Sequence, residues 1–375
     1  MNILFVTAHP AQVHNFRLVR ELLLSKGHNV FWLTTPKDIA TNLLDVYGIP
    51  YEIIQKSPKS FVGRVWYMLK NLLFLLPYLK KNKIDLVVDR YEPFITVAAW
   101  LSRTPHICLA DTEHAAKICK PLLKMCDHVF IPDCFYEPIL KNMSRFAGNI
   151  ELFYCHPRRY NRNEPWTLLD IPKNTSYVIV RFVKWDAYHD VKLVGGFSVE
   201  QKIKLIQSLS KKIKIFISAE SDLPKELEQY RINIPIERMH DVLSFSSLFI
   251  GESASMASEA VVLGTPAIYV DEIGRGYTDE EARAGLLWMY RPVTNKLDLK
   301  KDEKAWISGG VEECIAKAEE MISGKFNYEE WNDRHKRWMD TKIDCTKWLA
   351  WIIEKYPESV SQWKDLRGTL ETNFK

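Results

Sequence analysis

One stretch decides the fold, and it reads Leu248-Phe-Ile-Gly-Glu-Ser-Ala-Ser-Met-Ala-Ser-Glu-Ala-Val-Val-Leu-Gly-Thr-Pro-Ala-Ile-Tyr-Val270. An apolar run ends at Gly251, small residues with hydroxyl groups then begin a helix, and Gly264 and Pro266 separate that helix from a second apolar run. A strand, a helix and a second strand in this order form the repeating unit of a parallel sheet covered by helices. The stretch therefore predicts an α/β fold.

The start of the predicted helix is suited to hold a phosphate. Free backbone amides in a first helical turn and the positive helix end attract anions, and small side chains let a diphosphate approach. Farther along the same helix, a carboxylate could accept two hydrogen bonds from a ribose diol. An ordinary strand–helix–strand unit with a serine N-cap would show the same pattern. The candidate nucleotide-sugar ligands in this stretch are Ser253, Ala254, Ser255, Met256 and Glu259.

The same alternation runs along both halves of the chain. In the first half we expect strands at residues 2–7, 29–34, 51–54, 84–89, 106–109 and 128–131, separated by helices that include 61–79, 94–102 and 114–123. In the second half strands are expected at 177–182, 213–218, 248–251 and 266–270, and helices at 200–209, 223–230, 239–245, 253–263, 311–322 and 328–356. Two doubly wound, Rossmann-like domains that face a central cleft are the simplest fold class for this pattern.

Length and one polar segment set the expected domain bounds. A chain of 375 residues favours two domains over one. The irregular segment that begins Pro157-Arg-Arg-Tyr is expected to link them, and the apolar stripe Trp348, Trp351 and Ile352 is expected to carry the last helices back to the first domain. The predicted parts are an N-terminal domain at 1–156, a linker at 157–175, a nucleotide-sugar-binding domain at 176–338 and returning helices at 339–375.

Composition and charge exclude several classes of protein. Hydrophobic residues make up 47% of the chain and charged residues 26%, which are ordinary values for a globular protein. They argue against disorder, collagen-like repeats and a polytopic membrane protein. The net charge of +4 is too small to indicate nucleic acid binding, which needs a concentrated basic face. We therefore expect no nucleic acid partner.

Cysteine usage and missing motifs limit the expected cofactors. The seven cysteines include no Cys-x-x-Cys pair and no zinc-ligand spacing, which is typical of free thiols in a reducing cytoplasm. No Asp-x-Asp loop indicates a metal, and no Gly-x-Gly-x-x-Gly follows the first strand to bind a dinucleotide. The sequence predicts neither a metal nor a cofactor. Because the N-terminus has no basic, cleavable leader, we expect a cytoplasmic protein.

The apolar run at residues 65–79 raises the question of a membrane. Lys70, Asn71 and Pro77 interrupt it, and it is shorter than the ~20 apolar residues that span a bilayer. A group of lysines follows it directly. An interfacial helix at the inner face of a membrane and a core-facing helix with a solvated end both fit this pattern.

Several further blocks resemble the domain of unknown function 354 family. They are Asp111-Thr-Glu-His-Ala115, Arg181-Phe, Asp186-Ala-Tyr-His-Asp190, Phe197-Ser, Ile217-Ser-Ala-Glu220 and Glu237-Arg-Met-His-Asp241. This family is similar to GT-B glycosyltransferases and to the non-hydrolysing UDP-N-acetylglucosamine 2-epimerases. The Gly-Glu-Ser-x-Ser and Leu-Gly-Thr-Pro spacing of the first stretch also resembles the nucleotide-sugar half of GT-B proteins. The resemblance implies a GT-B-like fold, in which the last helices usually cross back to the first domain.

The resemblance to the epimerases can be followed residue by residue. Asp89 resembles their catalytic Asp, Glu113 resembles the catalytic Glu of a His-Val-Glu-Ala-Gly turn, and His189 resembles a histidine on the phosphate side. Ser253 and Glu259 resemble their Ser and second Glu. The epimerases also carry an acidic residue in a later loop and an arginine in the first loop, and this chain lacks both. Since elimination and re-addition at a sugar carbon needs acid and base groups on both faces, the loss favours glycosyl transfer.

Glycosyl transfer makes smaller demands on the chain. It needs one general base for the acceptor hydroxyl, and positive or dipolar groups for the leaving diphosphate. Acidic residues follow two buried strands of the first half, and the first loop carries two histidines. All of them are expected at the edge where the carboxyl ends of the strands meet. Glu113 is the preferred base, and the other catalytic candidates are Asp89, Asp111, His9 and His14.

Further binding residues are expected in the second half. A basic stretch that includes Arg181 and His189 would place cations beside the diphosphate. Met239 and His240 would border the pocket for the base. The segment 274–281 contains enough glycine to be mobile and to cover the donor sugar.

These observations favour an enzyme that moves a sugar from a nucleotide donor, with UDP preferred, to a saccharide or lipid-linked acceptor. We expect it to act in bacterial or archaeal surface polysaccharide or glycoconjugate synthesis. A UDP-N-acetyl-sugar 2-epimerase, non-hydrolysing or hydrolysing, is the first alternative, and a non-catalytic nucleotide-sugar-binding protein is the second. The expected partners are a UDP-sugar and the acceptor, and a peripheral contact with a membrane is left open.

Overall fold

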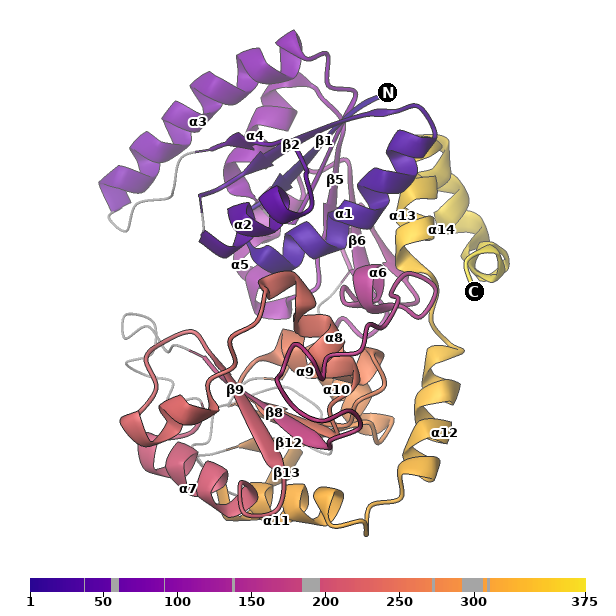
Figure 1. Cartoon of the computed structure of the whole chain (residues 1–375). Helices are drawn as coiled ribbons and strands as arrows, with labels where there is room; N and C mark the ends of the chain where they lie inside the picture. The colour runs from indigo at the N-terminus through magenta and orange to yellow at the C-terminus, as the bar shows by residue number, and fades with distance from the viewer. Residues whose placement is uncertain are drawn as a thin grey trace. The chain divides into compact units, whose positions relative to one another are not determined.

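The computed structural model describes residues 1–36, 38–54, 61–90, 92–136, 139–183, 196–271, 274–291, 306–308 and 311–375. They form two compact units (Figure 1). The first unit joins Met1–Arg159 to Lys342–Lys375, and the second is Tyr160–Thr341. His189, one of the expected ligands, lies outside the described residues.

The first unit contains a sheet of seven parallel strands in the order β3-β2-β1-β4-β5-β6-β7. The strands are β1 (Asn2–Thr7), β2 (Asn29–Thr34), β3 (Glu52–Ile53), β4 (Leu86–Asp89), β5 (His106–Leu109), β6 (His128–Pro132) and β7 (Met143–Phe146). Its helices are α1 (Pro10–Ser25), α2 (Asp38–Val46), α3 (Phe61–Lys81), α4 (Pro93–Ser102), α5 (Glu113–Leu123), α6 (Leu152–Cys155), α13 (Cys345–Glu354) and α14 (Glu358–Leu370). The strand order reverses between β1 and β4.

Helices cover both faces of this sheet because successive residues of a strand point to opposite sides. Leu4 and Val6 of β1 pack into a core cluster with residues of α3 and α4. Phe5, which lies between them in sequence, stacks on Phe16 of α1 with ring centroids 4.8 Å apart. The apolar run that begins the chain is therefore buried on both sides, as in other doubly wound sheets.

The second unit contains a sheet of six parallel strands in the order β13-β12-β11-β10-β8-β9. The strands are β8 (Tyr177–Phe182), β9 (Lys214–Ala219), β10 (Leu248–Gly251), β11 (Ala267–Val270), β12 (Leu287–Arg291) and β13 (Trp306–Ser308). The helices are α7 (Val199–Leu209), α8 (Met239–Ser244), α9 (Ala254–Val262), α10 (Gly276–Arg283), α11 (Val311–Ile322) and α12 (Tyr328–Met339), with short 3₁₀ turns η1 (Lys225–Tyr230) and η2 (Ile236–Arg238). Here the strand order reverses between β8 and β10.

These two sheets confirm the prediction of an α/β chain with two Rossmann-like parts. Three strands and three helices were not predicted, namely β7, β12, β13, α6, α10 and α14. β7 is a four-residue edge strand whose middle residues, Ser144 and Arg145, are half-buried, so no apolar run marks it. The apolar run of β12 is too short to distinguish from a helix by periodicity.

The segment predicted as a linker, 157–175, contains no helix or strand, and from Tyr160 onward it belongs to the second unit. The Tyr160 hydroxyl and the Asn163 backbone amide both donate to the Asp241 carboxylate. The Trp166 ring packs on Phe245 with centroids 5.1 Å apart. Tyr160 and Asn163 are polar residues of an irregular segment, and the buried Asp241 carboxylate holds both of them in place. Hydrogen bonds from Tyr160 and Arg238 lower the pKa of Asp241, although burial by itself raises it.

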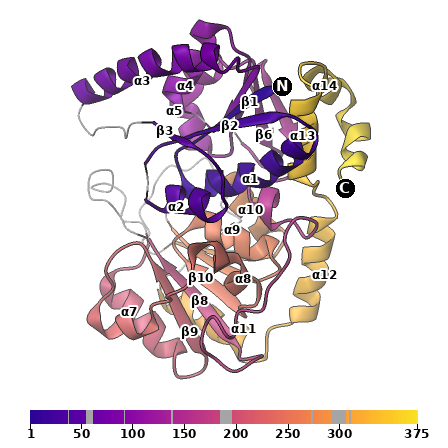
Figure 2. The ribbon, with the colours of Figure 1, turned by 45° about the horizontal axis from the view of Figure 1, so that its top comes forward.

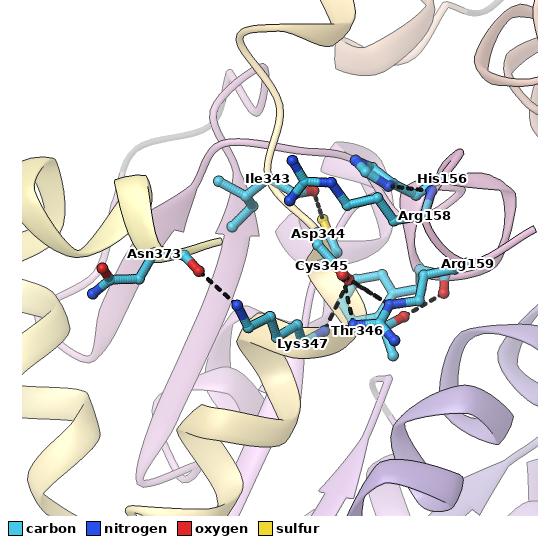
Figure 3. Close-up of polar contacts among 10 residues, drawn as sticks. His156, Arg158, Arg159, Ile343, Asp344, Cys345, Thr346, Lys347 and Asn373 are labelled. Carbon is cyan, nitrogen blue, oxygen red and sulfur yellow. Dashed lines mark hydrogen bonds and ion pairs between the residues drawn. The ribbon is translucent and has the colours of Figure 1, made fainter. Parts of the chain in front are cut away.

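The chain crosses between the units after Arg159 and again before Lys342. One ion pair within the first unit connects the two crossing points (Figure 3). The Arg159 guanidinium bonds the Asp344 carboxylate through Nε at 2.8 Å and Nη2 at 2.6 Å. Asp344 is also the N-cap of α13, because its side chain accepts from the Lys347 amide at 2.9 Å. This cap starts a new helix, which explains why the predicted single helix at 328–356 is two helices.

The C-terminal helices α13 and α14 pack in the first unit, with α13 beside α1 in both views (Figures 1 and 2). Trp348 of α13 stacks on Phe146 with centroids 4.7 Å apart. Trp363 of α14 donates from its indole nitrogen to the Arg145 carbonyl at 2.9 Å. The buried aromatic residues of these helices thus complete the core around β7.

Candidate functional site

The second unit offers a ligand position where its strand order reverses. In doubly wound sheets, ligands bind outside the carboxyl ends of the strands at such a reversal. Arg181 of β8 and Gly251 of β10 lie opposite each other in the strand register. A Cβ at Gly251 would lie 2.8 Å from both Cβ and the carbonyl oxygen of Arg181, so a larger residue would push the strands apart. The first strand of the stretch that predicted the fold, β10, therefore ends at the sheet edge where a ligand is expected.

The first turn of α9 begins directly after this strand and is accessible. Ser253 is the N-cap residue, and its hydroxyl accepts from the Met256 amide at 3.3 Å. Residues 253–256, which include the candidates Ala254 and Ser255, are partly exposed, whereas 257–262 are buried. The turn holds no acidic residue, so nothing within it neutralises the positive helix end. Its small side chains and amides suit a phosphate group.

Two candidate residues from different helices meet behind this turn. Glu259 lies in the buried part of α9, and its Oε1 is 3.4 Å from Nε2 of His240 on α8. The Tyr160 and His240 rings form an edge-to-face pair with centroids 6.2 Å apart. Met239, the first residue of α8, is partly exposed. The structure thus brings together His240 and Glu259, which the sequence assigned to the base and to the ribose.

Arg181 is held by the neighbouring strand. Its Nη1 donates to the Ser218 hydroxyl at 2.7 Å, and Nη2 pairs with the Glu220 carboxylate. The side chain is 16% exposed, and both of its terminal nitrogens have partners in the second unit. The Ile217-Ser-Ala-Glu220 block that the sequence marked is therefore the support of Arg181.

The sequence reasoning gave no role to Glu252, although the residue lies inside the decisive stretch. Its carboxylate is buried and accepts from the backbone amides of Val183 at 2.8 Å and Phe197 at 2.7 Å. Nζ of Lys202 lies 3.4 Å away. Burial raises the pKa of Glu252, against the opposing effects of Lys202 and the two amides. Val183 precedes residues 184–195 in the sequence, and Phe197 follows them, so Glu252 binds the chain on both sides of this segment.

The segment expected to be a mobile cover is a packed helix instead. Arg275 precedes α10, and its backbone amide donates to the Thr278 hydroxyl at 3.0 Å. Thr278 and Glu281 are buried, and the hydroxyl of Ser258 on α9 bonds the Glu281 carboxylate. Because these polar groups are paired inside the unit, the prediction of a mobile segment at 274–281 is wrong for the helical part.

The strand order of the first sheet reverses between β1 and β4, and β4 ends at Asp89. Asp89 has no exposed surface. One carboxylate oxygen is 2.8 Å from Nε2 of His106, and the other accepts from the Glu92 amide at 2.9 Å. Because both of its oxygens are used in this way, the buried Asp89 carboxylate is suited to orient the His106 ring and the start of α4.

The buried partner of Asp89 has an unusual proton affinity. Burial alone lowers the pKa of His106, but the Asp89 carboxylate and Cys126 raise it to about 10. A hydrogen bond with Cys108, followed by the charge of His106, lowers the pKa of Cys126 to about 6 against the effect of burial. The folded first unit therefore favours a protonated His106.

Asp89→Asn should remove a pH-dependent part of the stability. His106 binds its proton up to about pH 10 when folded but only to its ordinary value of 6.5 when unfolded. A raised pKa stabilises the fold fully below about pH 6.5, and the gain is lost as pH rises to about 10. The difference in unfolding free energy between parent and variant should shrink across this window, by at most about 1.4 kcal/mol per pH unit. Urea unfolding at several pH values measures it, and a constant difference would contradict the pairing.

An arginine that the sequence analysis did not select links the first unit's candidates. Arg90 follows Asp89, and its Nη2 is 2.5 Å from Oδ1 of Asp111. Its Nη1 donates to Oδ1 of Asn15 at 2.8 Å, and Asn15 donates in turn to the Ile150 carbonyl. Both members of the ion pair are largely buried. The pair connects the ends of β4 and β5 to α1 and fixes the Asp111 carboxylate.

Glu113, the preferred base, is the first residue of α5 rather than part of a turn. Thr112 is the N-cap, and the Glu113 side chain is 7% exposed. The amino end of a helix favours an anionic side chain. Together with Asp89 and Asp111, Glu113 follows the adjacent strands β4 and β5, so all three acids belong to one sheet edge.

The two histidines of the first segment are separated by the start of α1. Pro10 is the first residue of this helix, a position that proline favours, so the prediction that His14 lies in the first loop is wrong. His14 is buried, and its ring centroid lies 5.2 Å from that of Tyr154. His9 is exposed and caps α1, because Nδ1 accepts from the Ala11 amide at 3.3 Å. His9 therefore keeps the accessible position expected of it.

Within the described ranges, no three or more His, Cys, Asp or Glu side chains are grouped so that they could hold a metal ion.

Two kinds of enzyme of known structure share the fold. MurG of Acinetobacter baumannii superposes with a TM-score of 0.58 at 15% identity, over 95% of this chain and 100% of its own. A UDP-GlcNAc 2-epimerase of Neisseria meningitidis, solved bound to UDP-GlcNAc, superposes with a TM-score of 0.64 at 12% identity, over 95% and 100%. These similarities show that the chain has a GT-B-like fold.

One comparison of sequences points in the same direction. A protein of Buchnera aphidicola is 24% identical over 271 residues, which cover 67% of this chain and 73% of that protein. It is named UDP-N-acetylglucosamine--N-acetylmuramyl-(pentapeptide) pyrophosphoryl-undecaprenol N-acetylglucosamine transferase. No protein-family model matches the chain, so membership of the domain of unknown function 354 family stays a prediction.

Proposed function

We propose that the chain is a glycosyltransferase that takes a sugar from a UDP-linked donor, with UDP-N-acetylglucosamine as the first donor to test. The observation that carries the proposal is the open first turn of α9 at the reversal of the second sheet, with the His240–Glu259 pair behind it. The names of the similar proteins support the choice of donor, since a transferase and an epimerase among them both act on or bind UDP-N-acetylglucosamine.

In this proposal the second unit binds the donor through a few contacts. The first turn of α9, residues 253–256, holds the diphosphate with the amides of Ala254 and Ser255 as donors, and Arg181 adds a positive charge. The Glu259 carboxylate accepts from the ribose diol, while Met239 and His240 border the base. Lipid-linked or free saccharides remain the acceptors expected from the sequence.

The first unit supplies the groups that act on the acceptor. Glu113 removes the proton from an acceptor hydroxyl, the oxygen bonds to the anomeric carbon, and the bond from that carbon to the UDP oxygen breaks. Asp111, fixed by Arg90, orients the acceptor. Asp89 acts as a positioning residue because both of its carboxylate oxygens already have partners. His9 is the accessible candidate for a further acceptor contact.

A UDP-N-acetyl-sugar 2-epimerase is the second candidate function. The specific observation in its favour is that Asp89 and Glu113, the counterparts expected from the resemblance, lie at one sheet edge and are both buried. Incubation of the purified chain with UDP-N-acetylglucosamine alone separates the two functions. Formation of the epimer without an acceptor supports the epimerase, and release of UDP that requires an acceptor supports the transferase. Binding without either reaction would leave a nucleotide-sugar-binding protein.

Glu259→Ala should weaken UDP binding at least roughly tenfold. The variant loses up to two hydrogen bonds between a carboxylate and the ribose, each worth about 1.5–3 kcal/mol. Glu259→Gln should cost less, since its amide oxygen still accepts. Isothermal titration with UDP measures both variants.

A matched control separates lost contacts from lost folding in this experiment. Glu226 lies on η1 and is exposed, so Glu226→Ala should bind UDP like the parent. If Glu259→Ala and Glu259→Gln also bind UDP like the parent while remaining folded, Glu259 does not contact the ribose, and the proposed donor site loses its main support.

A further inference from the structure

Helix α3 exposes large apolar side chains, which is unusual for a helix in contact with water. Trp66, Leu69, Leu73 and Phe74 recur at helical spacing, and their exposed fractions are 69%, 49%, 77% and 40%. Polar residues are expected on the outer stripe of a surface helix. Contiguous exposed apolar side chains of this size mark a site of interaction.

The opposite stripe of α3 is anchored in the first unit. Leu75, Tyr78 and Leu79 are buried in the core cluster that also contains residues of β1 and α4. The Tyr67 ring meets Phe94 of α4 edge-on at 5.7 Å. Figures 1 and 2 show α3 beside α4 on the outer side of this unit. The helix is therefore apolar on both stripes, and only one of them is used by the fold.

Helix α4, which packs beside α3, carries a second pair of exposed apolar residues. Trp100 and Leu101 near its C-terminus are 59% and 50% exposed. Both helices lead into parallel neighbouring strands, α3 into β4 and α4 into β5, so their C-terminal ends lie at the same edge of the sheet. We name the exposed residues Trp66, Leu69, Leu73, Phe74, Trp100 and Leu101 the α3–α4 face.

Cations accompany the α3–α4 face. Lys70 lies on the exposed stripe itself, the exposed Lys80 and Lys81 end α3, and the exposed Lys83 and Arg103 follow the two helices. No aspartate or glutamate occurs in residues 61–83 or 93–105. An apolar surface with tryptophan, bordered by cations, complements the interface of a bilayer with anionic lipid headgroups.

We propose that the α3–α4 face docks on the surface of a membrane that contains anionic phospholipid. The apolar side chains enter the boundary between headgroups and acyl chains, and the lysines contact lipid phosphates. None of the described helices is long and apolar enough to cross a membrane. This inference does not depend on the sugar donor, because the face belongs to the first unit and uses none of the donor residues.

Sedimentation with lipid vesicles tests the proposal on the full chain. The parent should bind vesicles of phosphatidylcholine with about 30% phosphatidylglycerol, and bind pure phosphatidylcholine more weakly. Leu73→Glu should reduce binding to the anionic vesicles at least roughly tenfold. Leu366→Glu is the matched control, since Leu366 of α14 is 55% exposed but lies outside the face, and it should bind like the parent.

A second variant tests the charges separately. Lys80→Gln with Lys81→Gln should weaken binding to the anionic vesicles by roughly fivefold per lysine and leave binding to phosphatidylcholine unchanged. UDP titration and the thermal unfolding midpoint confirm that each variant remains folded. Equal sedimentation of the parent, Leu73→Glu and Leu366→Glu would overturn the proposal. So would a parental dimer that Leu73→Glu converts to a monomer, because a second copy would then cover the face.

Discussion

Glu113→Gln should lower the turnover of a UDP-sugar by roughly 10²–10⁴-fold, the range typical of a lost general base. The amide keeps the size of the side chain and its place at the start of α5 but cannot take the proton of the acceptor. UDP binding should change little, since Glu113 belongs to the first unit and the proposed donor ligands to the second. Release of UDP in the presence of acceptor gives kcat, and isothermal titration gives the UDP affinity.

The control for this prediction is a glutamate in the same helical position. Glu358 is the exposed first residue of α14, so Glu358→Gln should keep parental turnover. Turnover of Glu113→Gln within about twofold of the parent would exclude Glu113 as the base. Asp111→Asn would then be the next variant to measure, because its carboxylate follows the same strand and is fixed by Arg90.

The features that the sequence predicted well are local ones. The end of β10, the serine N-cap of α9 and the glycine that follows the helix all lie within one short stretch, and each has a physical signature of its own. Gly264 has a φ of +89°, a conformation that side chains disfavour. Strand–helix alternation then extends the prediction to both units, because a parallel sheet needs a crossover between its strands.

The contacts that the sequence did not predict connect distant elements. Arg90 and Asp111 follow different strands, and only the register of the sheet and the rotamers of both side chains make them a pair. No pattern in the sequence marks that pairing. The burial of His14 had a local signal, since Pro10 starts a helix, and the prediction did not use it.

Glu252 shows the same limit most clearly. It lies in the stretch that decides the fold, yet its partners are backbone amides of Val183 and Phe197, whose positions no side-chain pattern reveals. Its carboxylate joins the end of β8 to the start of α7 across residues 184–195 of the sequence. A buried carboxylate with such partners holds two backbone segments together. Its removal should therefore lower the free energy of unfolding more than it lowers catalytic turnover.

Glu252→Ala should lower the free energy of unfolding by about 3–5 kcal/mol. The substitution leaves two buried amides without their acceptor and removes the partner of Lys202. Glu252→Gln should lose less, because its amide oxygen still accepts one of the two hydrogen bonds. Denaturant unfolding at neutral pH measures both variants, with Glu226→Ala on the exposed turn η1 as the control, for which we expect a change within about 0.5 kcal/mol. A loss of stability no larger than in that control would mean that Glu252 does not brace the unit, and equal losses for Ala and Gln would mean that the hydrogen bond kept by Gln adds nothing to stability.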